Sequence, residues 1–231
     1  MNARYVIKED PYGLGNHFGI AITNNFPARY NIAPSQPVPI IRQGPDGRRE
    51  YTLVRWGFVP SWDRAGQMFK RSIVNIRSES APEKNSFRHA WRRRHCLFPM
   101  NGFYEWLDGP DGKQPYLHAL AENMPLFSLA GLWEDWLGED GSEMTTAAFL
   151  TRDGIFPLTG EVDRVPVFVP PDRYDDWLHA DETDDSLARE IVGLPDPDFI
   201  HWPVSQRVNS WKPDDEGLIQ PILLNAQQSL F

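Results

Sequence analysis

The residues Gly102-Phe103-Tyr104-Glu105-Trp106 place one acid inside an otherwise aromatic stretch. If this stretch is a strand, Phe103 and Glu105 share one face, while Tyr104 and Trp106 share the other. A carboxylate in apolar surroundings must be paired, hydrogen-bonded or desolvated, and desolvation raises its pKa toward the range useful for proton transfer. The alternative is an ordinary ion pair with a nearby arginine, and this segment alone leaves both interpretations open.

A second candidate group lies in the alternating stretch Val74-Asn75-Ile76-Arg77-Ser78-Glu79. If this stretch is extended, Asn75, Arg77 and Glu79 face the same way. Such a row could hold a substrate phosphate on Arg77, oriented by Glu79, with Asn75 directed at a reacting group. It could equally be a polar edge strand.

The loop-like sequence Trp56-Gly57-Phe58-Val59-Pro60-Ser61-Trp62 carries two tryptophans that flank a glycine and a proline. An exposed tryptophan on a rigid loop can stack on an unpaired base, which contributes about 1–3 kcal/mol per base. With nine tryptophans in the chain, burial in the core is the better expectation for any single one.

Other chemistries have little support in the sequence. The six histidines form no i,i+4 pair and no Cys/His cluster, and no Gly-rich phosphate loop is present, so we expect neither a metal nor a cofactor. Cys96 adjoins Leu97 and Phe98, which favours packing as a small hydrophobe. A peptidase that uses Cys96 as its nucleophile is the least favoured hypothesis.

The scaffold that positions these residues is expected to consist of short strands and loops, because 21 prolines and 17 glycines spread along the chain interrupt regular structure. The turn-forming cluster Asp108-Gly-Pro-Asp-Gly112 predicts a hairpin of two strands, 102–107 and 115–120. Further strands are predicted at 37–42, 51–58, 94–99, 126–132, 145–151 and 166–169, and helices at 80–93, 171–179 and 184–193. The outcome is a strand-rich α+β fold.

Length and composition favour one large domain over residues 1–224, followed by a frayed tail at 225–231. The sequence shows no secretory signal and no run of 18 apolar residues, and its single cysteine fits a reducing cytosol.

The net charge of −9 is unevenly distributed. Residues 1–130 hold 17 Lys and Arg against 11 Asp and Glu, which gives a net charge of +6. Residues 131–231 carry a net charge of −15. A basic face on an acidic protein can bind phosphates. The run Arg92-Arg93-Arg94 fits such a face or a solvated helix end equally well.

The order of the motifs resembles that of the SRAP (SOS-response-associated peptidase) family of abasic-site processing proteins, which occur in bacteria, phages and eukaryotes. Each motif alone is weak, but ten in the right order are strong support. The matching segments are Arg4, Tyr30–Pro34, Trp56–Trp62, Asn75–Glu79, Cys96–Pro99, Gly102–Trp106, Lys113–Tyr116, Ala130–Trp133, Asp163–Val167 and Pro203–Asn209.

The resemblance implies a single β-rich domain with a closed or bifurcated sheet, helices around it and a basic groove for single-stranded DNA. In this family, removal of the initiator methionine exposes a cysteine whose α-amine attacks the ring-opened abasic sugar and whose thiol seals a thiazolidine crosslink. An α-amine is partly neutral at pH 7, unlike lysine. The family acts in the DNA damage (SOS) response with lyase and autopeptidase chemistry.

The resemblance also assigns roles to individual residues. Glu105 would protonate the departing ring oxygen, Asn75 would position the terminus formed by Met1 or Asn2, and a set of further residues would contact the DNA. That set comprises Arg4 and Arg77 on phosphates, Trp56 and Trp62 as wedges, and Asn31, Pro34, Trp106 and Arg164. We expect a monomer in the bacterial cytosol that joins the nucleoid when it is bound to DNA.

The chain departs from the family pattern at two decisive positions. Asn2 stands where the family has its cysteine, and Val162 aligns with the catalytic histidine. A thiazolidine cannot form without a thiol. Our leading hypothesis is therefore a protein that binds abasic sites in single-stranded DNA with impaired or altered chemistry, in which a reversible Schiff base on the Met1 amine stays possible. The alternative is a scaffold or protein-interaction module that does not bind DNA and works through its acidic half.

Overall fold

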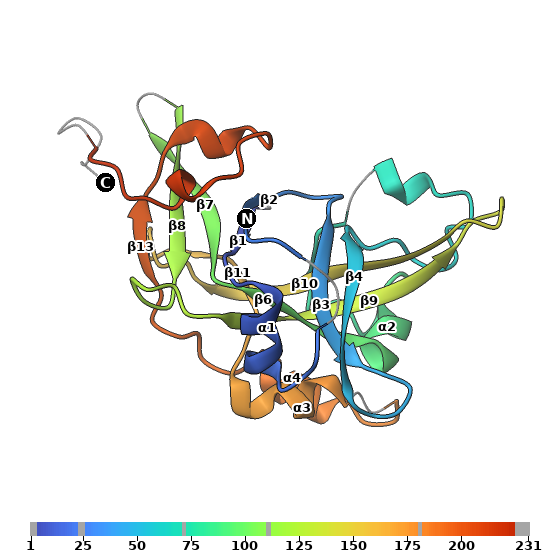
Figure 1. Ribbon diagram of the computed structural model, residues 1–231. Coiled ribbons are helices and arrows are strands. Elements are labelled where there is room, and N and C mark those ends of the chain that lie inside the picture. Colours follow the sequence, from blue (N-terminus) through green and yellow to red (C-terminus); the bar gives the residue numbers. More distant parts are fainter. Residues whose placement is uncertain (1–3, 23–25, 71–72, 110–111, 180–181, 225–231) are drawn as a thin grey trace.

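The computed structural model describes residues 4–22, 26–70, 73–109, 112–179 and 182–224, in two sheets with helices packed around them (Figure 1). The predictions made for Met1, Asn2 and the tail 225–231 lie outside the described residues. Within this part of the chain, no helix is long and apolar enough to cross a bilayer.

The first sheet has five strands and includes the predicted hairpin. In spatial order the strands are β13 (Ile200–Pro203), β8 (Gly112–Ala119), β7 (Gly102–Gly109), β1 (Tyr5–Ile7) and β2 (Arg29–Ile32). The hairpin of β7 and β8 is confirmed, with a register that pairs Phe103 with His118 and Glu105 with Tyr116. Strand β1 pairs with the other side of β7, so the start of the described chain lies beside Glu105's strand.

The second sheet is larger and closes on itself. Its order is β11 (Val162–Pro166), β10 (Glu143–Ile155), β4 (Arg49–Trp56), β3 (Pro37–Gln43), β6 (His95–Met100), β9 (Phe127–Leu137) and β12 (Phe168–Val169), with β5 (Asn75–Arg77) against β10. Because β9 also pairs with β10, the strands β10, β4, β3, β6 and β9 form a closed ring. The predicted α+β class with a closed sheet is confirmed.

Helices cover the ring and the ends of the sheets. They are α1 (Pro11–Phe18), α2 (Arg88–Arg93), α3 (Tyr174–Leu178) and α4 (Ser186–Val192), with 3₁₀ turns η1 (Gln67–Lys70), η2 (Pro171–Arg173), η3 (Gln206–Asn209) and η4 (Glu216–Leu218). Helix α1 begins at Pro11, after Asp10 accepts a hydrogen bond from the Gly13 N–H, and it ends at Gly19. The prediction of one helix over 80–93 is wrong for its first half, because Asn85 and Ser86 favour turns there.

Two apolar clusters hold the molecule together. The larger one fills the ring and extends to α3 and α4, with Trp56, Phe98 and Trp177 fully buried. The smaller one lies on the opposite face of the hairpin, where Tyr104 and Leu117 pack against the segment 204–219. The alternation expected from the sequence is confirmed, since Phe103 belongs to the first cluster and Tyr104 to the second.

Candidate functional site

Glu105 lies in the middle of β7 and only 4% of its surface is exposed. Its neighbour across the hairpin is Tyr116, on the face that also carries Phe103. Close contact between the two strands is required at the start of β7, because a Cβ on Gly102 would meet the His118 carbonyl oxygen at 2.8 Å. The predicted desolvated position of this acid is therefore observed, on a hairpin whose first residue must be a glycine.

The start of the described chain lies next to this acid. The Tyr104 N–H donates to the carbonyl oxygen of Arg4 at 3.0 Å, and Tyr5 pairs with Phe103. The Arg4 side chain is half-buried, and burial lowers the pKa of its guanidinium.

Asn75 opens β5, which runs parallel to β10 with Asn75 beside Phe149. Its side-chain oxygen is buried and has no hydrogen-bond partner among the described residues. A buried carbonyl oxygen without a donor is costly, so it indicates a group that binds there. Asn75 thus has an acceptor ready for the N–H of a ligand or of the chain terminus.

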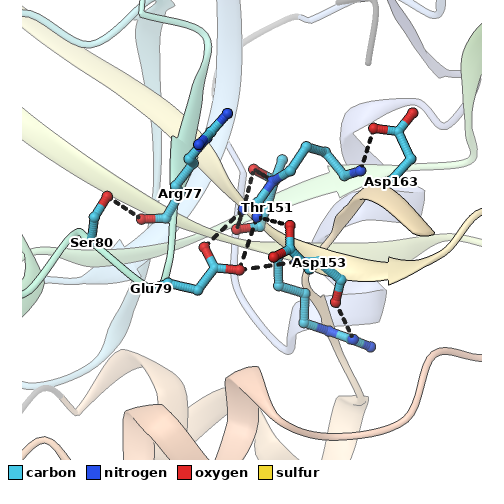
Figure 2. Close-up of polar contacts among 8 residues, drawn as sticks. Arg77, Glu79, Ser80, Thr151, Asp153 and Asp163 are labelled. Atoms are coloured by element: carbon cyan, nitrogen blue, oxygen red, sulfur yellow. Dashed lines mark hydrogen bonds and ion pairs between the residues drawn. The ribbon is translucent and has the colours of Figure 1, made fainter.

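Arg77, two residues further along β5, is exposed. Its guanidinium forms no ion pair within the part of the chain that the structure describes, and Figure 2 shows it directed away from the Glu79 carboxylate. The predicted pairing of Glu79 with Arg77 is therefore absent from this structure. The cation of Arg77 is available to a phosphate.

Glu79 instead accepts a hydrogen bond from Arg164. The guanidinium of Arg164 also donates to Asp153 and Thr151, which Figure 2 labels beside Glu79. Burial would raise the pKa of Glu79, but the hydrogen bonds and the charge of Arg164 lower it to about 2. The Arg164 Nε and both Nη atoms donate within this network, and the side chain is 18% exposed. Arg164 therefore ties β5 to β10 and β11, and its predicted contact with DNA stays a prediction.

Trp56 lies in the core, where it cannot reach DNA in this conformation. Its ring is 0% exposed, which excludes stacking on a base in this conformation. The indole N–H donates to the carbonyl oxygen of Val74 at 3.1 Å, and the ring packs edge-on against Tyr5 at 5.0 Å and stacks on Phe149 at 5.6 Å. Trp56 therefore connects the strand of Asn75 to the strand that follows the chain start.

Trp62, by contrast, is 58% exposed. The loop behind it is held by Asp63, whose carboxylate accepts hydrogen bonds from the backbone N–H groups of Gln67 and Met68. An exposed indole on an ordered loop is available for stacking. The two tryptophans of one motif thus have opposite environments.

The remaining predicted DNA contacts are mixed. Asn31 is fully buried, and its Nδ2 donates to the carbonyl oxygens of Ser210 and Pro213, so its role is structural. Pro34 is half-buried in the turn after β2. Trp106 is half-buried, and its indole N–H donates to Asn209 Oδ1 at 2.6 Å, which leaves part of one face open.

Several of the basic residues in positions 1–130 are paired with acids. Arg94 binds the buried Glu134, and Arg93 binds Glu182. Further pairs are Arg29–Asp214, Arg42–Glu50 and Arg49–Asp175. These pairs neutralise part of the basic half, whereas Arg77 on β5 forms no ion pair among the described residues.

The thiol of Cys96 is fully buried, and burial raises its pKa well above the usual value. A buried, protonated thiol is neither accessible nor nucleophilic. The interpretation of Cys96 as a small core residue is confirmed, and a peptidase nucleophile at this position is excluded.

The sequence analysis missed two histidines on the face of Glu105. His118 on β8 and His201 on β13 pair with each other, and His118 also pairs with Phe103. The hairpin turn at 108–112 fixes this register, so His118 was predictable once the turn was recognised. His201 was not, because no local signal indicates that β13 joins β8.

Among the described residues, the candidate groups are a buried acid on β7, an amide oxygen without a hydrogen-bond partner on β5 and an arginine without an ion pair on β5. The acid can exchange a proton, the amide can orient an N–H group, and the arginine can hold an anion.

Comparison with known proteins gives consistent matches. The family described as SOS response associated peptidase (SRAP) matches residues 1–211. Abasic site processing protein YoqW of Bacillus subtilis (strain 168) is 32% identical over 195 residues, which cover 83% of this chain and 85% of YoqW. Abasic site processing protein YedK of Escherichia coli (strain K12) is 28% identical and covers 84% of this chain and 85% of YedK.

Solved structures share the fold. A crystal structure of a protein from Bordetella bronchiseptica superposes with a TM-score of 0.74 at 26% identity and covers 88% of this chain and 99% of its own. A crystal structure of a protein from Bacteroides thetaiotaomicron gives a TM-score of 0.79 at 22% identity and covers 95% of this chain and 99% of its own.

Proposed function

Because the chain belongs to the SOS response associated peptidase (SRAP) family, we propose that it binds abasic sites in single-stranded DNA at the face that carries Glu105, Asn75 and Arg77. The observation that carries the proposal is the convergence of three strands. Strand β1, which opens the described chain, pairs with the strand of Glu105, and Trp56 links β1 to β5, where Asn75 and Arg77 lie.

Each of these residues has a defined task in the proposal. Arg77 holds a backbone phosphate, and the exposed Trp62 stacks on a neighbouring unpaired base. Asn75 orients the terminal amine through its buried Oδ1. Glu105 gives a proton to the ring oxygen of the abasic deoxyribose as the ring opens to the aldehyde.

The amine of Met1 then adds to the aldehyde carbon and loses water, which forms an imine. Water takes the proton next to the imine carbon, and the electron pair of that C–H bond expels the 3′ phosphate, so the strand is cleaved by β-elimination. Asn2 has no thiol to close a thiazolidine ring, so the adduct stays hydrolysable. Val162, 73% exposed, cannot supply the proton transfers of an imidazole.

The test is reductive trapping on a single-stranded oligonucleotide with one abasic site, with intact protein mass as readout. Borohydride reduces an imine to a stable amine, so we expect a trapped adduct for the native chain. Glu105→Gln should lower the trapping rate at least tenfold, whereas Glu139→Gln, which removes an exposed carboxylate of the β9–β10 turn, should leave it unchanged. Equal trapping by the two variants would remove Glu105 from the mechanism.

A salt titration of binding to the same oligonucleotide separates this function from a scaffold that does not bind DNA. Each phosphate neutralised on a single strand contributes a slope of about −0.7 in log K against log salt. We expect a slope of about −1 to −2 from Arg77 and Arg4. No binding at low salt would favour the interaction module.

A further inference from the structure

His118 is a buried imidazole without a hydrogen bond. It is 0% exposed, and neither ring nitrogen has a partner among the residues that the structure describes. His95 is also buried, but its Nδ1 and Nε2 lie 2.7 and 2.6 Å from the carbonyl oxygens of Trp177 and Trp91. An unsatisfied buried polar group costs about 1–3 kcal/mol, so stability alone does not explain His118.

The strand register places His118 beside Glu105. Phe103, His118 and His201 form one row across β7, β8 and β13. Glu105 and Tyr116 form a second pair, two residues away from Phe103 and His118 along their strands. Because side chains alternate between the faces of a sheet, both pairs lie on the same face. Glu105 and His118 are therefore diagonal neighbours, with their Cα atoms about 7–8 Å apart and their Cβ atoms somewhat closer.

Three rings lie around His118, two of them aromatic hydrocarbons and one an imidazole. Phe103 stacks on it at 5.0 Å with an interplanar angle of 5°, and Phe156 lies 5.8 Å away. The ring of His201 lies 5.5 Å from His118, and His201 itself is exposed. The titratable groups on this face of the three strands are thus Glu105, Tyr116 and His201.

His118 is neutral at pH 7. Burial, and then the nearby His201, lower its pKa to about 3. A neutral imidazole has one nitrogen that donates and one that accepts, so it can pass a proton through the ring without holding a charge.

We propose that His118 and His201 relay protons from solvent to Glu105 during the abasic-site reaction, an inference that rests on the proposed function. When Glu105 protonates the departing ring oxygen, its carboxylate takes a proton from one nitrogen of His118. The other nitrogen of His118 takes a proton from His201, which takes one from water. Because neither ring nitrogen of His118 has a partner among the described residues, the proposal requires that its hydrogen bonds to Glu105 and His201 form during the reaction. One proton enters from solvent for each proton delivered to the sugar. His118 acts through Glu105 and makes no contact with the substrate.

The first test needs no DNA and is therefore independent of the proposed function. In protein labelled with ¹⁵N-histidine, the Glu105→Gln change should shift the imidazole nitrogen resonances of His118 and alter its tautomer ratio. Those of His95, a buried histidine held by backbone carbonyls, should stay unchanged and serve as the internal control. Unchanged resonances of His118 would overturn the relay even if the protein forms adducts with DNA.

The second test is chemical rescue of borohydride trapping. His201→Ala changes an exposed residue, so we expect a folded protein that traps at least tenfold more slowly at pH 7 and recovers when imidazole is added. His118→Phe keeps an aromatic ring between Phe103 and Phe156 and should be as slow but should not recover. Native rates in both variants would overturn the relay. If the native chain itself traps nothing, the proposed function has failed, and the resonances of His118 decide the relay alone.

Discussion

The indole N–H of Trp56 donates a hydrogen bond to the carbonyl oxygen of Val74, the residue before Asn75, at 3.1 Å. The same ring packs edge-on against Tyr5, the first residue of β1. One buried side chain therefore sets the position of the unsatisfied amide relative to the strand that follows the chain start. This is why a tryptophan that never touches a ligand can still control the site.

Replacing Trp56 with phenylalanine should destabilise the protein and impair the site together. The Val74 carbonyl loses its hydrogen-bond donor, and leaving such a group unsatisfied lowers the free energy of unfolding by about 1–3 kcal/mol. The loss is measured as a lower midpoint of urea unfolding. Trp62→Phe, at the exposed end of the same motif, should change the unfolding free energy by less than about 0.5 kcal/mol. Equal effects at the two positions would contradict the assigned roles.

Removal of the Trp62 ring should weaken DNA binding without unfolding the protein. We expect Trp62→Ala to lower the affinity for single-stranded DNA by about 1–3 kcal/mol, the contribution of one stacked base. Fluorescence anisotropy with a labelled oligonucleotide measures the loss. Trp62→Phe retains a stacking ring and should keep most of the affinity. A loss that is the same for alanine and phenylalanine would argue against stacking.

Arg77 and Arg164 form a matched pair of tests, since both lie near Glu79 but only Arg164 is ion-paired. Arg77→Ala should weaken binding equally for all sequences and reduce the salt slope by about 0.7, the share of one phosphate. Arg164→Ala should instead lower the urea midpoint, because Glu79 and Asp153 lose their partner. If Arg164→Ala changed the salt slope and Arg77→Ala did not, Arg164 rather than Arg77 would hold the phosphate.

The ion pair of Glu79 predicts a definite dependence of stability on pH. Burial opposes ionisation of Glu79, but Arg164 outweighs it, so the pKa falls from 4.5 to about 2. A carboxyl whose folded pKa is depressed stabilises the fold above its unfolded pKa, and this contribution is lost as the pH falls from about 4.5 toward 2.

Unfolding midpoints of the native chain and of Glu79→Gln should therefore differ at pH 7 and converge between pH 4.5 and 2. Asp175 and Asp215 also have lowered pKa values from arginine partners, so the difference between the two proteins, rather than either curve alone, isolates Glu79. A difference that stays constant over this pH range would show that Glu79 does not stabilise the fold as an ion.

Local patterns in the sequence determined a good part of the scaffold. Side-chain alternation and the turn at 108–112 predicted the hairpin, and hence the face shared by Phe103 and Glu105, because both signals act between neighbours in the chain. Strands β3, β4, β6, β9 and β10 were expected near their observed positions for the same reason. Strand β1 was missed, because its three residues are too short for a pattern.

Only the tertiary structure decided which polar residues are free to bind a ligand. Trp56 and Trp62 belong to one motif, yet packing from β1, β5 and β10 buries the first and leaves the second exposed. Arg164 reaches Glu79 across 85 positions in the sequence, and no local pattern indicates such a partner. Burial and ion pairing arise from segments that meet only after folding, so the types of residue were readable from the sequence, while their availability was not.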